Sequence, residues 1–267
     1  MGEAYADAAT ASSYLPSVDM TFDFDAATAM LTAVKSYSAG PARSAIEASL
    51  LAWPAGHRGA FLTNHDQPRV MAELADVDRA KLAGELLLTS PGVPFVYYGE
   101  EVGLDGTKPD EQIRTPMPWT GKAAGVGFTS GTPWEPPSAG FETANVATET
   151  ADDRSILSAY RSLIHLRAAH PALARGGATV LEASDVGILA VLRRSPEETL
   201  LVLSNVGVGD IPAPSVDLTA AAGCLSGTAP EVLYGPAKAA SPGSDPAAYR
   251  PIDTLPAGST VVVNLGG

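Results

Sequence analysis

The sequence is poor in two features that would restrict its fold class. Cys224 is the only cysteine among 267 residues, so an intrachain disulfide is excluded and stability has to come from packing. No apolar run reaches 18 residues, because Ser90, Pro91, Gly92 and Pro94 interrupt the stretch 86–98. A membrane-spanning helix is therefore not expected.

Basic residues are also scarce. There are 17 Lys and Arg against 30 Asp and Glu, which gives a net charge of −13. Nucleic acids and anionic membrane surfaces favour basic patches, so we expect neither as a partner. Residues 1–7 lack the basic region and the apolar core of a signal peptide, and the localisation stays open.

The first 120 residues alternate short apolar runs with amphipathic stretches, a pattern typical of βα units around a parallel sheet. We expect strands over 18–24, 59–63 and 94–99, the last of them buried, and helices over 26–37, 43–51 and 78–89. Residues 104–150 are rich in Gly, Pro, Ser and Thr and predict a long structured loop rather than a linker.

A further helix is expected to run to about Ala169, with Asp152 or Asp153 as its N-cap. After Gly176 and Gly177 the pattern changes to short β-type runs, over 179–181, 187–193, 199–204, 232–234 and 259–265. This predicts a division into 1–175 and 176–267, the second unit being an antiparallel sheet or sandwich.

The stretch from Phe61 to Arg69 is the most informative. A short apolar run ends in five polar side chains: Asn64, His65, Asp66, Gln67 and Arg69. Such a cluster is poorly suited to a core and well suited to a pocket for a hydroxyl-rich ligand at the carboxyl end of a barrel strand.

These residues resemble the strand-seven motif of the α-amylase superfamily of glycoside hydrolases. Gly2-Glu3-Ala4-Tyr5 resembles its strand-five motif, and 91–104 resembles its eighth strand and the following loop. The stretch 108–119 resembles the Arg-Thr-Pro-Met loop of its α-glucosidase branch. The resemblance implies an α/β fold: the C-terminal half of a (β/α)8 TIM barrel, followed by a small antiparallel β-sandwich domain.

The resemblance also implies a function and residue roles. The function would be retaining hydrolysis of α-glucosidic bonds in an α-linked oligosaccharide or α-glucan. Glu3 would be the general acid/base and Asp66 the carboxylate that stabilises the transition state. His65 would donate to a sugar hydroxyl, and Arg69 would bind the sugar or the nucleophile. Asn64 and Gln67 would complete the substrate-binding set.

One family element is missing from the sequence. The family's nucleophile lies in a Gly-Phe-Arg-x-Asp motif on strand four, and no such motif occurs here. We therefore expect the N-terminal half of the barrel to be a missing partner and this chain alone to be inactive. Alternatives are a non-catalytic carbohydrate-binding or scaffold remnant, and a relative that transfers or isomerises glucosyl units.

Other candidates have less specific support. No cofactor and no metal site are expected in this chain, although calcium is possible in the full-length enzyme. Glu100 and Glu101 are compatible with sugar binding or with a structural hydrogen bond at a strand end. Trp53, Trp119 and Trp134 could stack on sugars, but core or loop packing is the preferred interpretation.

Overall fold

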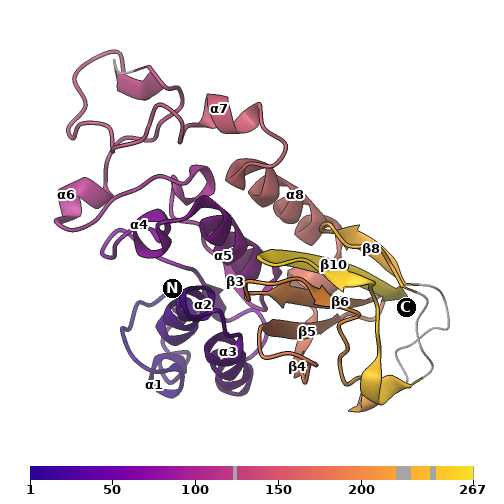
Figure 1. Ribbon diagram of the computed structural model, residues 1–267. Helices are drawn as coiled ribbons and strands as arrows, with labels where there is room; N and C mark the ends of the chain where they lie inside the picture. The colour runs from indigo at the N-terminus through magenta and orange to yellow at the C-terminus, as the bar shows by residue number, and fades with distance from the viewer. Residues whose placement is uncertain (123–124, 221–229, 241–244, 267) are drawn as a thin grey trace.

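The computed structural model describes residues 1–267 except 123–124, 221–229, 241–244 and 267. Cys224 lies outside the described residues. Figure 1 shows the helices and the parallel strands of the first half beside the antiparallel sheet of the second, with the loop that carries α6 and α7 extending away from that sheet. No helix in the described part of the chain is long and apolar enough to cross a membrane.

A small parallel sheet lies in the first half of the chain. β1 (Thr21–Phe22), β2 (Arg58–Ala60) and β3 (Val93–Pro94) pair in sequence order, and Gly2 forms a parallel bridge to Thr21 on the outer side of β1. The paired segments are shorter than expected. The predicted buried strand 94–99 is wrong beyond Pro94, since Val96 and Tyr98 are partly exposed.

Helices connect these strands and cover one side of them. α2 (Phe24–Ser36) and α3 (Gly40–Ala52) follow β1, and α4 (Val70–Leu74) and α5 (Val77–Thr89) follow β2. The Asp23 carboxylate accepts from the Ala26 N–H at 3.0 Å, so α2 begins directly after β1. Shorter elements are α1 (Ala8–Ser12), η1 (Glu100–Val102), α6 (Asp110–Ile113), η2 (Gly125–Gly127) and α7 (Val146–Thr150).

The last long helix, α8 (Ile156–Ala169), begins later than expected. Its N-cap is Ser155, whose hydroxyl accepts from the Ser158 N–H at 3.1 Å, and not Asp152 or Asp153. Asp152 instead accepts from the Arg154 N–H in the preceding turn. His170 separates α8 from α9 (Pro171–Arg175).

The second half of the chain forms a five-stranded antiparallel sheet in the order β4-β5-β6-β10-β8. Its strands are β4 (Gly177–Leu181), β5 (Ile188–Arg194), β6 (Thr199–Asn205), β10 (Ser259–Gly266) and β8 (Glu231–Tyr234). β7 (Ile211–Pro212) and β9 (Thr254–Leu255) form a separate two-stranded ribbon, and η4 (Pro246–Ala248) precedes β9.

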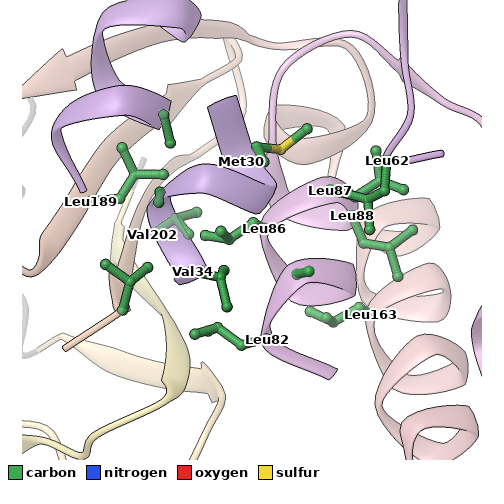
Figure 2. Packing of buried hydrophobic residues seen from close by; sticks show 14 of the residues in the cluster. Met30, Val34, Leu62, Leu82, Leu86, Leu87, Leu88, Leu163, Leu189 and Val202 are labelled. Carbon is green, nitrogen blue, oxygen red and sulfur yellow. The ribbon is translucent and has the colours of Figure 1, made fainter. Parts of the chain in front are cut away.

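The central strand β6 has apolar side chains on both faces of this sheet, because successive side chains point to opposite faces. Leu200 and Val202 of β6 belong to the largest hydrophobic cluster, and Leu201 and Leu203 belong to a second cluster on the opposite face. The largest cluster joins the sheet to α2, α5 and α8 (Figure 2). The division at 175 stays a prediction, since this cluster lies on both sides of it.

Two buried arginines donate to carbonyl groups at or just beyond the ends of helices. Arg193 of β5 donates to the carbonyls of Thr89, Leu173 and Gly176, at the carboxyl ends of α5 and α9. Arg167 of α8 donates to the carbonyls of Leu88, Ser90 and Gly92. These side chains satisfy carbonyl groups that a helix end leaves unpaired.

Candidate active site

The polar stretch predicted from the sequence forms a turn at the carboxyl end of β2. Phe61, Leu62 and Thr63 remain buried after the strand ends, and the chain then emerges at Asn64. The Asn64 Oδ1 accepts from the Asp66 N–H at 2.9 Å and fixes the turn. His65 and Asp66 are exposed as a result.

Three of the predicted site residues line one cavity. Glu3, Asn64 and His65 surround a volume of about 190 Å³, and its other walls include Phe22, Phe61, Phe95 and Tyr97. The Phe22 ring is in edge contact with Phe61 and Phe95, at centroid distances of 5.2 and 5.0 Å. The cavity thus combines a carboxylate, an amide and an imidazole with an aromatic wall.

Asp66 is not part of this cavity lining. Its Oδ1 accepts from the Arg114 Nη2 at 2.8 Å and lies 3.5 Å from the His65 Nε2. Glu3 and Asp66 also follow parallel segments that are not direct neighbours. β1 lies between the Gly2 bridge and β2, because the segment 18–24 pairs with both.

Arg114 contacts two of the predicted site residues, His65 and Asp66. Its Nε donates to the His65 carbonyl at 3.0 Å, and its Nη2 donates to Asp66 and to Asp110. It therefore fixes the turn of β2 from a loop almost 50 residues later. The only sequence signal was its place in the Arg-Thr-Pro-Met stretch.

Arg69, for which the resemblance implies binding to the sugar or the nucleophile, is buried. It is 1% exposed, its guanidinium carbon is 4.5 and 4.7 Å from the ring centroids of Tyr97 and Tyr98, and its Nη1 donates to the Tyr98 carbonyl at 2.6 Å. Burial lowers its pKa. Gln67 is half-buried, and its Oε1 has no hydrogen-bond partner among the described residues.

Glu100 and Glu101, the two carboxylates that follow β3, have different environments. Glu100 is buried and accepts from the Tyr160 hydroxyl at 2.6 Å, and burial raises the pKa of Glu100 to about 8. This is a structural contact. Burial also raises the pKa of Glu101, but Glu101 lines a second cavity.

The second cavity has a volume of about 600 Å³ and lies beside the Asp66–Arg114 pair. Arg114 belongs to its wall together with Trp119, Phe128 and Trp134. Trp119 and Trp134 are 50% and 72% exposed and so lie outside the core, and the Trp119 N–H donates to the Val126 carbonyl of the same loop at 2.9 Å. Trp53, by contrast, is buried and donates to the Thr21 hydroxyl at 2.8 Å.

No group of three or more His, Cys, Asp or Glu among the described residues could hold a metal ion. The functional groups gathered here are carboxylates, an imidazole, amides and aromatic rings. They are suited to binding hydroxyl groups and to proton transfer at a glycosidic oxygen.

Comparison with known proteins identifies the family. The sequence profile described as "Alpha amylase, catalytic domain" matches residues 1–176. The chain belongs to the α-amylase family of glycoside hydrolases. Alpha-amylase 3 of Dictyoglomus thermophilum is 38% identical to this α-amylase family chain over 149 residues, 55% of the chain and 29% of the relative.

Two further similar proteins extend the comparison. The oligo-1,6-glucosidase of Halalkalibacterium halodurans is 30% identical over 206 residues, covering 60% of the chain and 36% of the relative. The crystal structure of α-amylase from H. orenii superimposes with a TM-score of 0.78 and 27% identity, over 99% of this chain and 52% of that one. The chain thus spans about a third of these curated relatives and about half of the solved α-amylase.

Proposed function

We propose that this chain is the part of a retaining glycoside hydrolase that supplies strands five to eight of a (β/α)8 barrel. Its substrates would be α-glucosidic bonds in oligosaccharides or polysaccharides. The observation that carries the proposal is the cavity of Glu3, Asn64 and His65 at one end of parallel segments. Catalytic residues of TIM barrels lie at the carboxyl ends of the strands. Residues 176–267 would cover and stabilise the barrel.

The residues present divide the chemistry between them. Glu3 protonates the leaving glycosidic oxygen, and His65 donates to a hydroxyl of the sugar being cleaved. Asp66, held by Arg114, accepts from sugar hydroxyls more strongly in the oxocarbenium-like transition state than in the ground state. Asn64 and Gln67 contribute amide groups to the same sugar. Arg69 packs against Tyr97 and Tyr98 and carries a positive charge near Glu100 and Glu101.

Retention needs a second carboxylate on the opposite face of the sugar ring, about 5–5.5 Å from Glu3. We assign that nucleophile to a strand-four segment outside these 267 residues. Hydrolysis then requires this chain together with the first half of the barrel. Removing one member of a catalytic constellation typically costs several orders of magnitude in rate, because its members act as a unit.

The test is release of 4-nitrophenol from 4-nitrophenyl α-glucoside. The purified 267-residue chain should give no enzyme-like turnover. Joining it to the polypeptide encoded directly upstream, in cis or as a separate chain, should restore turnover, and Glu3→Gln should then abolish it. Glu231→Gln, on an exposed position of β8, is the matched control and should leave the rate unchanged. Robust turnover by the 267-residue chain alone, lost in Asp66→Asn, would contradict the assignment of the nucleophile.

A non-catalytic carbohydrate-binding role is the second candidate. The exposed Trp119 and Trp134 beside Arg114 favour it, since stacking on sugars needs no catalytic carboxylate. The two candidates give different results when this chain is joined to the upstream polypeptide. A non-catalytic protein would bind the glycan without hydrolysing it, and Glu3→Gln would not change that binding.

A further inference from the structure

A third cavity lies at the amino-terminal ends of the parallel strands. It has a volume of about 420 Å³ and is lined by three segments that lead into β2, β3 and β4, namely 53–58, 91–93 and 174–178. The cavity that contains Glu3 lies beyond the opposite, carboxyl ends and shares no lining residue with it. A ligand in this amino-end cavity would therefore not occupy the place of the sugar.

The charged side chains that line the amino-end cavity are all positive. They are Arg58, Arg175 and Arg193, and none of the lining residues is Asp or Glu. Arg58 is 3% exposed and Arg193 is 1% exposed, whereas Arg175 is exposed. In a chain with a net charge of −13, a cavity of this composition is a local reversal of sign.

The two buried arginines each retain an unused N–H donor. The Arg58 Nε donates to Asp23 at 2.6 Å and its Nη1 donates to the Pro91 carbonyl at 2.5 Å, while its Nη2 is buried without a partner among the described residues. The Arg193 Nε is also buried and unpartnered in the described part of the chain. Buried polar groups are nearly always hydrogen-bonded, so two such donors at one cavity point to a bound group that accepts from them.

The arginine cluster also has an excess of charge. Arg167 is buried beside the two lining arginines, and burial together with the charge of Arg58 lowers the pKa of Arg167 to about 10. Burial, followed by the charges of Arg167 and Arg58, lowers the pKa of Arg193 to about 9. Among the described residues Arg167 and Arg193 form no ion pair, and Asp23 pairs with Arg58. Three buried cations thus share one carboxylate, although a buried charge is costly without an opposite charge.

A phosphate group matches this excess in charge and in geometry. A phosphomonoester carries a charge of about −1.5 to −2 at pH 7, close to the two positive charges that Asp23 leaves uncompensated. Guanidinium groups bind phosphate oxygens through two parallel N–H donors. The cavity volume lies within the range of small-molecule sites, about 300–1,000 Å³, so a phosphate could enter with part of the molecule that carries it. Trp53 and Val93 offer apolar contacts to that part.

We propose that the amino-end cavity binds a phosphate group, either inorganic phosphate or a small phosphomonoester. Arg58 and Arg193 donate through the N–H groups that have no protein partner, and Arg175 binds from the exposed edge. Bound phosphate neutralises the cluster that joins α8 and β5 to the start of β2. The site is distinct from the one that cleaves glycosidic bonds and does not depend on the proposed function.

The test is thermal unfolding and calorimetry of the 267-residue chain with inorganic phosphate and with phenyl phosphate at neutral pH. Either probe should raise Tm in a saturable way at low millimolar concentration, because a ligand that binds only the native state stabilises it. Sodium chloride at the same ionic strength should not reproduce the shift. Tighter binding of phenyl phosphate would identify a phosphomonoester as the ligand, and equal binding would identify inorganic phosphate.

Variants at the exposed edge test the site without disturbing the buried arginines. Arg175→Gln should weaken phosphate binding roughly tenfold, since it removes one charge-assisted contact. Arg161→Gln, at an exposed position of α8 outside the cavity, is the control and should bind as the parent does. Gly177 lines the cavity, and no atom lies within 4 Å of its Cβ position. Gly177→Glu should therefore supply a tethered carboxylate and abolish phosphate binding, whereas Gly177→Gln should retain it.

Three results would overturn the proposal. They are the absence of saturable binding of both probes, equal phosphate binding by Arg175→Gln and the parent, and equal binding by Gly177→Glu and Gly177→Gln. The joined enzyme should still bind phosphate. Loss of binding there would also overturn the proposal, because it would mean that the upstream polypeptide fills the cavity. Hydrolysis of 4-nitrophenyl α-glucoside is measured separately, so its absence beside intact phosphate binding would reject the proposed function alone.

Discussion

The Tyr160 hydroxyl donates a 2.6 Å hydrogen bond to the Glu100 carboxyl group, and both side chains are buried. The contact joins α8 to η1, just beyond the segment that resembles the family's eighth strand. Burial raises the pKa of Glu100 to about 8 from an ordinary value of 4.5. The folded protein therefore keeps a proton there that the unfolded chain releases.

This pKa shift predicts a pH dependence of stability. Between about pH 4.5 and pH 8 the native state binds more protons at Glu100 than the unfolded state does, so its contribution to the free energy of unfolding falls as the pH rises. Glu100→Gln should remove this contribution. Urea unfolding at about pH 5 and about pH 8 should show a smaller loss for the variant than for the parent. Equal losses would contradict the prediction. Burial also raises the pKa of Glu85, which is present in both proteins and cancels in the comparison.

Gly84→Ala should destabilise the fold although alanine is the better helix former. A Cβ at Gly84 would lie 2.2 Å from the Tyr160 ring, at the contact between α5 and α8. We expect a net loss of about 1–3 kcal/mol in the free energy of unfolding. Gly209→Ala is the control, since no atom lies within 4 Å of its Cβ position, and it should change stability little. A stabilised Gly84→Ala would mean that the two helices can separate without cost.

Arg193→Met should be strongly destabilising because it leaves three carbonyl groups without this donor. They belong to Thr89, Leu173 and Gly176. A loss of about 2 kcal/mol or more is expected, measured by thermal or urea unfolding. Its neighbour Arg194 is exposed, and Arg194→Met should stay within about 0.5 kcal/mol of the parent. Similar effects of the two changes would argue against this role for Arg193.

Paired core substitutions test whether the chain unfolds as one unit. Leu86→Ala in α5 and Leu200→Ala in β6 both open the largest hydrophobic cluster, and each should cost about 2–5 kcal/mol. Both variants should lower the same single transition, followed by circular dichroism and tryptophan fluorescence. Leu51→Ala, at a position that is 91% exposed, is the control. Two transitions, each lowered by only one variant, would show that 1–175 and 176–267 unfold independently.

The sequence predicted the long elements better than the short ones. Helix 26–37 corresponds to α2 and run 199–204 to β6, because an Asp cap and a β-rich apolar run are local signals. The segment 94–99 was assigned as a buried strand from its apolar residues. The hydroxyls of Tyr97 and Tyr98 instead donate to the carbonyls of Ile113 and Thr115, contacts with a later loop that no local pattern contains.

The site, too, depends partly on contacts between distant segments that no local sequence pattern contains. The motif located Glu3, Asn64 and His65, which the structure brings to one cavity. It did not reveal that Arg114 holds the turn at Asp66, because that contact depends on how a loop folds back over the strand. The exposure of Trp119 and Trp134 was missed for a related reason. A tryptophan in a Pro-rich loop has the same local sequence whether its ring faces the core or the solvent.

Strands β5 and β6 have apolar side chains on both faces, and the segments that pack against the two faces are synthesised at different times. Residues 188–205 leave the ribosome after α2, α5 and α8, so helices are already available for one face of the strand pair. The hydrophobic cluster on the other face joins Leu201 and Leu203 to Val216 and Leu218 and also to Tyr249, Ile252 and Leu255, and the last three are made some 45–50 residues later. During that interval the strand pair presents an incompletely covered apolar surface and an unpaired edge at β6 to other nascent chains. A pause in translation between residues 205 and 254 should therefore favour aggregation far more than a pause of equal length before residue 188.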